Sequence, residues 1–317
     1  MKTNDVIFAT IRPTLRRIAI VPPHLNQQVC STGYFVLRPK AVLDHRFMYY
    51  WLFDEEFMGQ MEALQKGASY PAVTDKEVRD QVIPFPPLPE QQRIVTLLDK
   101  AFDGIATAKA NAEKNLQNTQ AIFESHLESV YSQRREGWVE TSLENCCEQI
   151  FAGGDVPKDC VSQDRTEKLN VPIFSNGEKN DGLYGFTAVA RVTKPSITIS
   201  ARGTIGFSVI RTEPYLPVVR LIVLIPDAAL VNLSFLYYRV IGMNFENTGT
   251  SIPQLTVPNI KGRTLYLPSL SLQTVIVAKL DALSEEVQRL ESIYQQKLSA
   301  LDDLKKSLLH HAFSGQI

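Results

Sequence analysis

Two short segments place an arginine and a threonine in matched turns between strand-like sequences. Residues 12–14 read Arg-Pro-Thr, and residues 202–204, 190 positions later, read Arg-Gly-Thr. A guanidinium in such a turn can grip a phosphate or bind the O6 and N7 acceptors of guanine, and a hydroxyl can contact the backbone of a nucleic acid. We therefore predict that Arg12, Thr14, Arg202 and Thr204 contact DNA. The alternative is that each arginine pairs with a carboxylate of its own domain.

Other polar residues extend these two candidate surfaces. Arg16 and Arg17 add positive charge beside Arg12 with few acidic residues nearby, which predicts a basic patch, although a solvated protein face has the same pattern. Residues 175–180, Ser-Asn-Gly-Glu-Lys-Asn, form a loop signature in which Asn176 and Lys179 could reach base edges or phosphates. An ordinary turn is the alternative for that loop.

A third pair of loops precedes a proline in each half of the chain. The first carries Ser69 and Tyr70, and the second carries Thr250 and Ser251. Hydroxyls and an aromatic ring at these positions could contact phosphates, so we include the four residues among the predicted DNA contacts. The alternative is a turn that only begins the next helix.

The composition argues against chemistry carried out by this chain alone. The five histidines lie in no His-Glu-x-x-His arrangement, the four cysteines have no Cys-x-x-Cys spacing, and no run of carboxylates suggests a metal site. We expect no metal, no cofactor and no catalytic residue, and we expect the cysteines to be reduced and partly buried. With 317 residues, a net charge of −1 and no apolar run of membrane-spanning length, we expect a cytoplasmic chain of two domains.

The matched turns and loops recur because the chain contains an internal repeat. One block repeats with a spacing of 182 residues: Ser69, Pro71, Thr74, Pro86, Leu88 and Gln91 return as Ser251, Pro253, Thr256, Pro268, Leu270 and Gln273. Upstream, Asp44-x-x-Phe47 matches Asn232-x-x-Phe235 at a spacing of 188. The repeat predicts two copies of one mixed α/β globule. The second copy begins near Gly137, and carrying that start back predicts that the first copy lacks roughly 45 to 50 residues at its front.

A long stretch without proline follows each globule. Apolar residues recur in it every three or four positions, from Ile94 to Val130 and from Ile276 to Ala312. We count Ile122 and His126 in the first of these stripes. Both stripes contain two successive spacings of four, centred on Ala112 and on Tyr294, and a shared stutter suits two helices that pair along one seam. We predict two helices of roughly 60 Å that form an antiparallel coiled coil with a globule at each end. Packing of each helix on its own globule is the alternative.

The run from Phe85 to Ile94 reads Phe-Pro-Pro-Leu-Pro-Glu-Gln-Gln-Arg-Ile, and a related run returns after a β-rich domain. In this the chain resembles the specificity subunit of type I restriction-modification enzymes, from about Asp5 to Ile317. The resemblance implies two target-recognition domains that each read one half of a split site in double-stranded DNA. It also implies that the helices dock methyltransferase subunits and, through them, restriction subunits. The chain departs from this pattern at residues 270–275, Leu-Ser-Leu-Gln-Thr-Val, and at the front of the first domain.

These observations predict an α+β chain of two target-recognition globules, the first partial, separated by two long antiparallel coiled-coil helices. The expected segments are a partial first domain (1–88), a first helix (89–136), a second domain (137–269) and a second helix (270–317). The favoured function is a non-catalytic DNA sequence-specificity subunit. The alternative is a truncated scaffold, impaired in DNA binding, that only docks methyltransferase subunits through its coiled coil. The partial domain also leaves a homodimer open.

Overall fold

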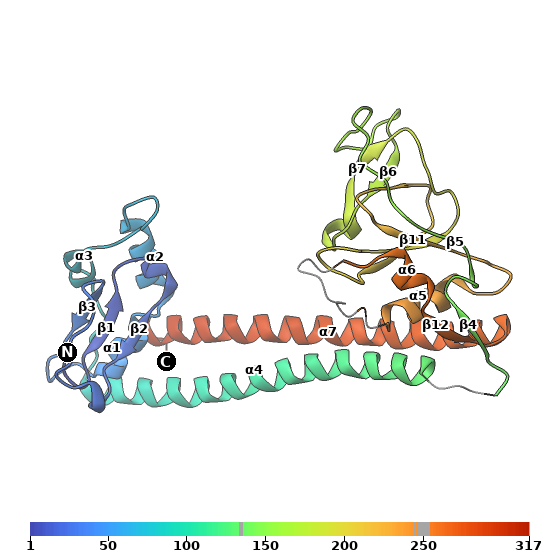
Figure 1. Ribbon diagram of the computed structural model, residues 1–317. Coiled ribbons are helices and arrows are strands. Elements are labelled where there is room, and N and C mark those ends of the chain that lie inside the picture. Colours follow the sequence, from blue (N-terminus) through green and yellow to red (C-terminus); the bar gives the residue numbers. More distant parts are fainter. Residues whose placement is uncertain (133–135, 244, 246–253, 317) are drawn as a thin grey trace. The chain divides into compact units, whose positions relative to one another are not determined.

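A computed structural model of the chain describes residues 1–132, 136–243, 245 and 254–316, which form two compact units (Figure 1). Unit 1 comprises residues 1–117 and 291–317, and unit 2 comprises residues 118–290. Two long helices contribute to both: α4 (Leu88–Tyr131) and α7 (Leu270–Phe313). Each unit therefore consists of one globule and a part of each long helix.

The globule of unit 1 is a three-stranded antiparallel sheet with short helices. Its strands are β1 (Val6–Ala9), β2 (Ile18–Ile20) and β3 (Tyr34–Leu37), in the order β2-β1-β3. Its helices are η1 (Pro13–Leu15), η2 (Pro23–Leu25), α1 (His45–Trp51), α2 (Glu55–Leu64) and α3 (Asp75–Arg79). In the register, Val6 lies opposite Leu37 and Phe8 opposite Phe35, so the core-facing residues of β1 and β3 meet on one face.

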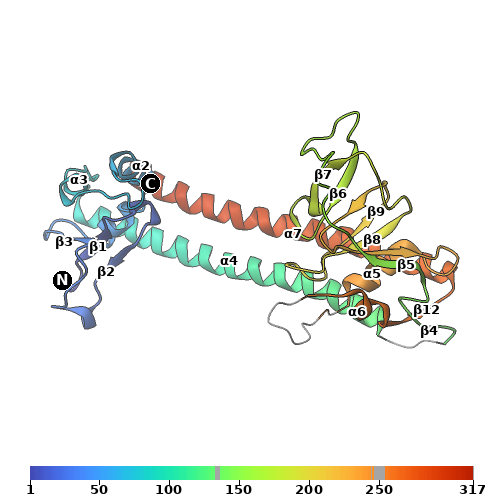
Figure 2. The ribbon, with the colours of Figure 1, turned by 45° about the horizontal axis from the view of Figure 1, so that its top comes forward.

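The globule of unit 2 is larger, and its described residues form three sheets (Figure 2). The central sheet has the order β5-β11-β8-β9, built from β5 (Cys147–Ala152), β8 (Ser196–Ile199), β9 (Ser208–Arg211) and β11 (Ile222–Pro226). A second has the order β10-β6-β7, built from β6 (Val171–Phe174), β7 (Leu183–Thr187) and β10 (Leu216–Pro217), and β4 (Val139–Ser142) pairs with β12 (Thr264–Leu267). The helices are η3 (Lys179–Gly182), α5 (Leu233–Ile241) and α6 (Val257–Lys261).

The predicted repeat is visible in the order of these elements. β2-β1-β3 in unit 1 has the same order as β9-β8-β11 in unit 2, and in both units a helix capped by a short polar side chain follows. The Asp44 carboxylate accepts the backbone N–H of Phe47 at the start of α1, and the Asn232 amide oxygen accepts that of Phe235 at the start of α5. The two globules are therefore diverged copies of one fold, as the sequence predicts.

A buried glutamine fixes the start of each long helix in the same way. The side chain of Gln91 accepts the N–H of Asp44 at 2.8 Å and donates to the carbonyls of Val42 and Pro86 at 3.1 and 2.8 Å. Gln273 accepts the N–H of Asn232 at 2.7 Å and donates to the carbonyls of Leu230 and Pro268 at 3.1 and 2.9 Å. Each network ties the proline-rich strand end, the loop before the capped helix and the first turn of the long helix together.

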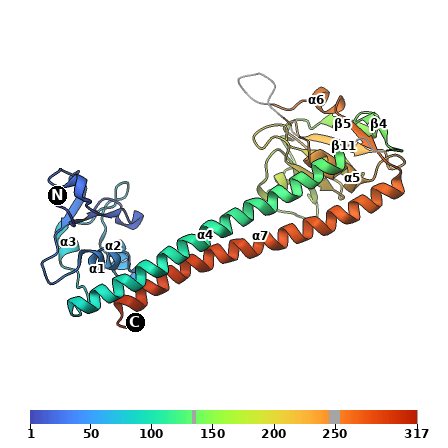
Figure 3. The same ribbon diagram turned by 90° about the horizontal axis from the view of Figure 1, so that it is seen from below.

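In each unit, segments of α4 and α7 lie side by side and antiparallel (Figure 3). In unit 1, Lys109 of α4 forms an ion pair of 2.7 Å with Asp302 of α7, and the ring of Phe313 near the end of α7 packs at 5.1 Å against Phe47 of α1. In unit 2, Tyr131 at the end of α4 packs at 5.1 Å against Phe235 of α5. The far end of each helix thus packs on the globule of the other copy, and the predicted mutual seam is present.

The position of the shared stutter differs from the prediction. Ile122 is 59% exposed, its counterpart Leu304 is 47% exposed, and His126 is also exposed, so these three residues do not lie on the seam. Buried residues recur at Leu98, Ile105, Ala112, Thr119 and Leu127, which moves the two successive spacings of four to 119–123–127. Phe123 and Leu127 replace their sequence neighbours Ile122 and His126, because the stripe shifts by one residue after Thr119.

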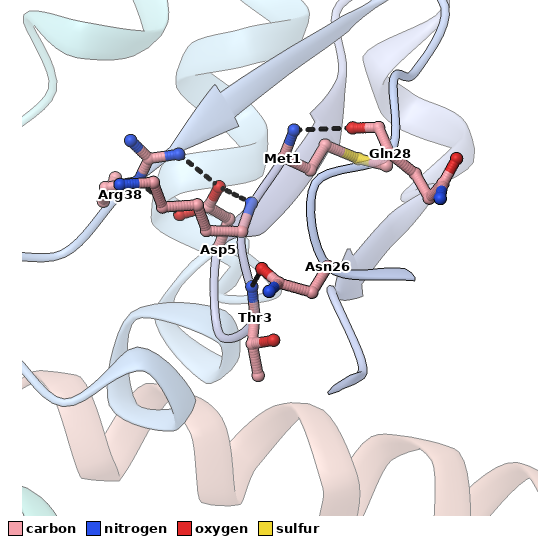
Figure 4. A network of polar contacts seen from close by, with 7 residues as sticks. Met1, Thr3, Asp5, Asn26, Gln28 and Arg38 are labelled. Atoms are coloured by element: carbon pink, nitrogen blue, oxygen red, sulfur yellow. Dashed lines mark hydrogen bonds and ion pairs between the residues drawn. The ribbon is translucent and has the colours of Figure 1, made fainter. Parts of the chain in front are cut away.

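The first strand of unit 1 is anchored by a charged pair at one end of the sheet. Both carboxylate oxygens of the buried Asp5 accept hydrogen bonds of 2.7 Å from the guanidinium of Arg38, which follows β3 (Figure 4). The hydrogen bonds from Arg38 hold the pKa of Asp5 below its ordinary value. The N-terminal amine of Met1 also donates to the Gln28 carbonyl at 2.7 Å. These contacts hold residues 1–5 in place beside β3.

Candidate nucleic-acid interface

The first candidate surface of unit 1 joins two loops that are far apart in sequence. The guanidinium of Arg12 donates to the carbonyl of Ser69 at 3.1 Å and lies 5.1 Å from the centre of the Tyr70 ring. The Tyr70 ring is 71% exposed, so the stacked pair presents both a positive charge and an aromatic face to solvent. Arg12, Ser69 and Tyr70, which the sequence suggested separately, are therefore brought together.

Backbone hydrogen bonds explain how the two loops meet. The N–H of Arg12 donates to the carbonyl of Pro71 at 2.7 Å, and the N–H of Val73 donates to the carbonyl of Thr10 at 2.9 Å. Gly67 has a φ of 106°, and a Cβ there would lie 3.0 Å from the carbonyl oxygen of Tyr70. The turn that carries Ser69 and Tyr70 thus requires glycine at its start.

The three remaining predicted residues of unit 1 have different surroundings. Thr14 lies exposed in η1, between Arg12 and Arg16, which both have positive φ values of about 51° and 52°. The guanidinium of Arg16 forms an ion pair of 2.6 Å with Glu55, so the structure commits this arginine to a carboxylate of its own domain. Arg17 is exposed and donates to the carbonyl of Ile11 at 3.4 Å. The surface suited to a phosphate therefore consists of Arg12, Thr14 and Arg17 with Ser69 and Tyr70.

The corresponding surface of unit 2 centres on Arg202. Its guanidinium donates to the side-chain oxygen of Gln254 at 2.9 Å, and both residues line a cavity of about 340 Å³ together with Arg220. Thr204 is exposed in the same loop. Two guanidinium groups and an amide that line one cavity form an arrangement that can pair with phosphate oxygens or with base edges. Thr250 and Ser251 lie outside the described residues.

Asn176 supports this surface from within. Its side-chain oxygen accepts the N–H of Ala201 at 2.7 Å, and its side-chain NH₂ donates to the carbonyl of Val219 at 2.6 Å. The amide therefore links the loop of Arg202 to the turn of Arg220, and both of its ends are used inside the protein. These contacts give the half-buried Asn176 a positioning role, and its contact with a base stays a prediction.

Lys179 is exposed in η3, and a buried arginine holds that loop. The Arg211 guanidinium donates to the carbonyl of Asp181 and to the hydroxyl of Thr198, and lies 3.6 Å from the centre of the Phe174 ring. Burial lowers the pKa of Arg211. Because Arg211 fixes the backbone at Asn180 and Asp181, which both have positive φ, Lys179 is presented at a defined place on the surface.

The structure also corrects the predicted pairing of the two arginines. The hydrogen bond from Val73 to Thr10 has its counterpart in the bond from Leu255 to Ala201, which sets the spacing here at 191 residues and not 190. Arg12 therefore corresponds to Gly203, which shares its positive φ, and Arg202 corresponds to Ile11. Both arginines lie in the same loop of the fold, one position apart.

Sequence reasoning missed two residues of the unit 2 surface. Gln254 directly follows Pro253 of the repeat, and that repeat was the one signal that could have pointed to it. Arg220 lies in a turn where Val219 and Arg220 both have positive φ, at 52° and 64°. Valine and arginine rarely adopt a positive φ, so no local sequence pattern predicts the turn.

The described residues hold neither a cluster of metal ligands nor a membrane-spanning helix. They contain no group of three or more His, Cys, Asp and Glu side chains that could hold a metal ion. The four cysteines form no disulfide; Cys146 is buried, whereas Cys160 is exposed, contrary to the expectation that all would be partly buried. No described helix has the length and apolar character needed to cross a membrane.

The model of the type I restriction modification DNA specificity domain matches residues 1–117 and 135–298 of the chain. The chain belongs to this family. A Mycoplasma pneumoniae protein named as a type I specificity subunit, S.MpnORF507P, is 33% identical over 216 residues, which are 68% of this chain and 58% of that protein. The EcoBI specificity subunit of Escherichia coli is 22% identical over a gapped alignment of 343 positions, which covers 93% of this chain and 70% of that subunit. The match thus spans less than two thirds of the first relative.

Solved structures of the family share the fold. The crystal structure of the HsdS subunit from Thermoanaerobacter tengcongensis aligns with a TM-score of 0.67 at 26% identity, over 100% of this chain and 82% of that one. A chain from a structure on complex assembly and conformational transition of the type I R-M system aligns with a TM-score of 0.89 at 26% identity, over 99% of this chain and 82% of that one. These likenesses confirm the α+β fold class with two globules and two long antiparallel helices.

Proposed function

We propose that the chain is the sequence-specificity subunit of a DNA-modifying complex and reads double-stranded DNA with one loop surface on each globule. The observation that carries this proposal is the occurrence of an exposed arginine surface in the same loop of both copies, around Arg12 and around Arg202. Because each globule has its own surface, the expected target consists of two half-sites. Membership of the specificity family supports the same conclusion.

The long helices are proposed to dock the methyltransferase subunits, and restriction subunits would join through these. The described residues contain no group of three or more His, Cys, Asp and Glu side chains that could hold a metal ion. In this proposal bond breaking and methyl transfer belong to the partners. The helices are suited to docking because their faces away from the seam are exposed, including Ile122 and Leu304 at corresponding positions. Exposed apolar residues at matched positions fit two copies of one partner.

The alternative function is a scaffold that docks methyltransferase subunits without reading the first half-site. The observation in its favour is that the sheet of unit 1 has three strands, whereas the central sheet of unit 2 has four. Both functions require docking, so docking alone does not separate them. They differ in whether the Arg12 surface binds bases.

The test is the methylation pattern of a complex reconstituted from the full chain and methyltransferase subunits on a library of duplexes. We expect a two-part motif, and we expect Arg202→Ala to relax the half read by unit 2 while the other half stays unchanged. A one-part motif that Arg12→Ala leaves unaltered would establish the scaffold function for unit 1. Methylation without any sequence preference would reject the proposed function for both units.

A further inference from the structure

A cavity of about 400 Å³ lies in unit 1 between α2, the end of α7 and residues 80–84. Three carboxylates line it, those of Asp54, Glu56 and Asp80, and its described lining residues include no arginine, lysine or histidine. Val82 at its edge is 87% exposed, so the cavity opens to solvent. The lining thus carries negative charge that no lining residue neutralises.

Asp54 is the buried member of this acidic set, at 4% exposure, whereas Glu56 and Asp80 are exposed. Its Oδ2 oxygen accepts the N–H of Glu56 at 3.2 Å and so caps α2, but its Oδ1 oxygen has no hydrogen-bond partner among the described residues. Burial raises the pKa of Asp54, and the nearby charge of His310 on α7 opposes this rise. The terminal torsion of an aspartate is soft, so either oxygen can turn toward the cavity. Because a buried acceptor without a partner costs free energy, Asp54 is suited to a ligand that donates hydrogen bonds and carries positive charge.

In unit 2 a guanidinium of the chain itself occupies the corresponding place. Arg239 of α5 donates to the carbonyl of Thr264 at 3.2 Å, and its guanidinium lies 5.8 Å from the centre of the Tyr131 ring. The counterparts of these two contacts in unit 1 are Val82 and Phe313, which both line the cavity. The place that Arg239 fills in unit 2 is therefore part of the cavity in unit 1.

One residue difference between the copies accounts for this. Arg239 corresponds to Trp51, whose indole carries no charge. Thr264 faces away from β4, because the hydrogen bond from Leu143 directs its neighbour Arg263 toward that strand. The space is thus filled in unit 2 by a side chain of the capped helix and not by a paired strand.

The walls of the cavity favour a guanidinium over a metal ion. The rings of Trp51, Phe57 and Phe313 line it, and the centres of the first two lie 4.6 Å apart. A guanidinium is flat, weakly hydrated and able to stack on aromatic faces, whereas a hard metal ion requires several oxygen ligands. The described part of the chain has no group of three or more side chains that could supply such ligands.

We propose that this cavity of unit 1 binds an alkylguanidinium cation from outside the chain, in the place that Arg239 fills in unit 2. The guanidinium pairs with Asp54 at the floor and donates to the carbonyl of Val82. Glu56 and Asp80 add negative charge at the rim. A small guanidinium compound and the arginine side chain of another protein share this chemistry. The site is independent of the proposed DNA surfaces, and binding requires neither DNA nor methyltransferase subunits.

The test is calorimetric titration of the full chain with two probes, agmatine and the tripeptide acetyl-Ala-Arg-Ala-amide. We expect saturable binding of one probe per chain, with a change in the fluorescence of Trp51 in a Trp138→Phe background. Binding of agmatine alone assigns the site to small compounds, and binding of the tripeptide assigns it to the arginine of a partner protein. The same tripeptide with lysine should bind about fivefold more weakly than the arginine form, because an ammonium is more strongly hydrated and offers no fork of parallel donors.

Variants of the cavity place the probe. Asp54→Asn removes the charge but keeps a residue that caps α2, and it should weaken binding by about tenfold or more. Glu62→Gln is the matched control, since Glu62 is an exposed carboxylate of the same helix outside the cavity, and binding should stay within about twofold. Trp51→Arg gives unit 1 the guanidinium that unit 2 has and should abolish binding.

The double variant Glu56→Gln, Asp80→Asn changes exposed side chains only and should weaken binding about threefold. It keeps the test decisive if Asp54→Asn or Trp51→Arg unfolds unit 1. Failure of both probes to bind the folded wild-type chain would overturn the proposal. So would equal binding of the arginine and lysine tripeptides, or full binding by a folded Asp54→Asn chain.

Discussion

The two globules are joined to the long helices by the same hydrogen bonds, but their sheets differ in the number of strands. Gln91 and Gln273 form the same three hydrogen bonds, and Tyr50 and Tyr238 each donate to an aspartate of the following helix, Asp99 and Asp281. Among the described residues the second edge of β3 pairs with no strand, whereas that of β11 pairs with β5. The comparison teaches that the hydrogen bonds that join globule and helix are the same in both copies, while the strands around the central sheet differ.

The largest expected effect tests whether the two glutamine junctions are equivalent. Gln91→Leu should lower the free energy of unfolding of unit 1 by about 3 kcal/mol, because three backbone groups lose the hydrogen bonds they form with a buried amide. Gln273→Leu should cost unit 2 about as much. Urea unfolding can follow the units separately, since Trp51 reports on unit 1 in a Trp138→Phe background and Trp138 reports on unit 2 in a Trp51→Phe background.

The neighbouring Gln92 is exposed and supplies the control. Gln92→Leu should change the unfolding free energy by less than about 0.5 kcal/mol. A loss below about 1 kcal/mol for either buried glutamine would contradict the shared junction.

The second prediction compares the two arginine surfaces. Arg12→Ala and Arg202→Ala should each weaken binding of the reconstituted complex to its target about tenfold and reduce the slope of log affinity against log salt by about one. Equilibrium binding at several salt concentrations measures both quantities. Arg16→Ala is the control, because Arg16 is paired with Glu55 and should leave DNA affinity within about twofold. An effect of Arg16→Ala as large as that of Arg12→Ala would contradict the assignment of the unit 1 surface.

The third prediction concerns the far ends of the helices. The hydroxyl of the buried Tyr131 donates to the carbonyl of Phe235 at 2.9 Å, whereas its counterpart in unit 1, Phe313, has no hydroxyl. Tyr131→Phe should therefore cost unit 2 about 1 kcal/mol of unfolding free energy, measured by the Trp138 signal. Phe313→Ala should cost unit 1 more, because it removes a ring packed on Phe47. If Phe313→Ala left the unfolding free energy of unit 1 unchanged, α7 would not stabilise the core of that unit.

The smallest effect distinguishes the units by pH. Asp5 in unit 1 has a lowered pKa, whereas its counterpart, Ser196, forms an uncharged hydrogen bond with Tyr215. A carboxyl with a lowered folded-state pKa stabilises the fold above its unfolded-state pKa, and this contribution disappears as the pH falls through the folded-state value. Arg38→Met should lower the stability of unit 1 at pH 7, and the loss of stability should become progressively smaller below pH 3.8.

Arg17→Met, at an exposed arginine of the same globule, is the control for this comparison. It should be indistinguishable from wild type at every pH. A difference between wild type and Arg38→Met that stays constant from pH 7 to pH 2 would contradict the role of Asp5. The Trp51 signal again reports on unit 1.

Much of the fold could be predicted from sequence because its signals are local. The start of α4 at Leu88 and of α7 at Leu270 follows from the proline-rich runs, and the caps at Asp44 and Asn232 mark the helices that follow them. The seam was less certain because Ile122 and Phe123 are both apolar and adjacent. Periodicity alone could not choose between them, and the partner helix decides the choice.

The candidate surfaces depended on contacts that no local pattern encodes. Arg16 meets Glu55 across 39 residues, and Asn176 meets Val219 across 43. A polar side chain in a loop has the same sequence signature whether it faces a ligand or holds a neighbouring turn. Only the fold shows that the Asn176 amide bonds to the backbone of Ala201 and Val219, whereas Lys179 is exposed.

The contact between Phe47 and Phe313 also determines when unit 1 can finish folding during translation. The core of unit 1 includes Leu309, Ala312 and Phe313, which lie more than 200 residues downstream of Val6 and Phe8 in the same core. At a translation rate of roughly 5–20 residues per second, the N-terminal globule waits on the order of tens of seconds for them. Unit 2 needs no residue beyond 290, so the globule made second on the ribosome is the first that can be completed.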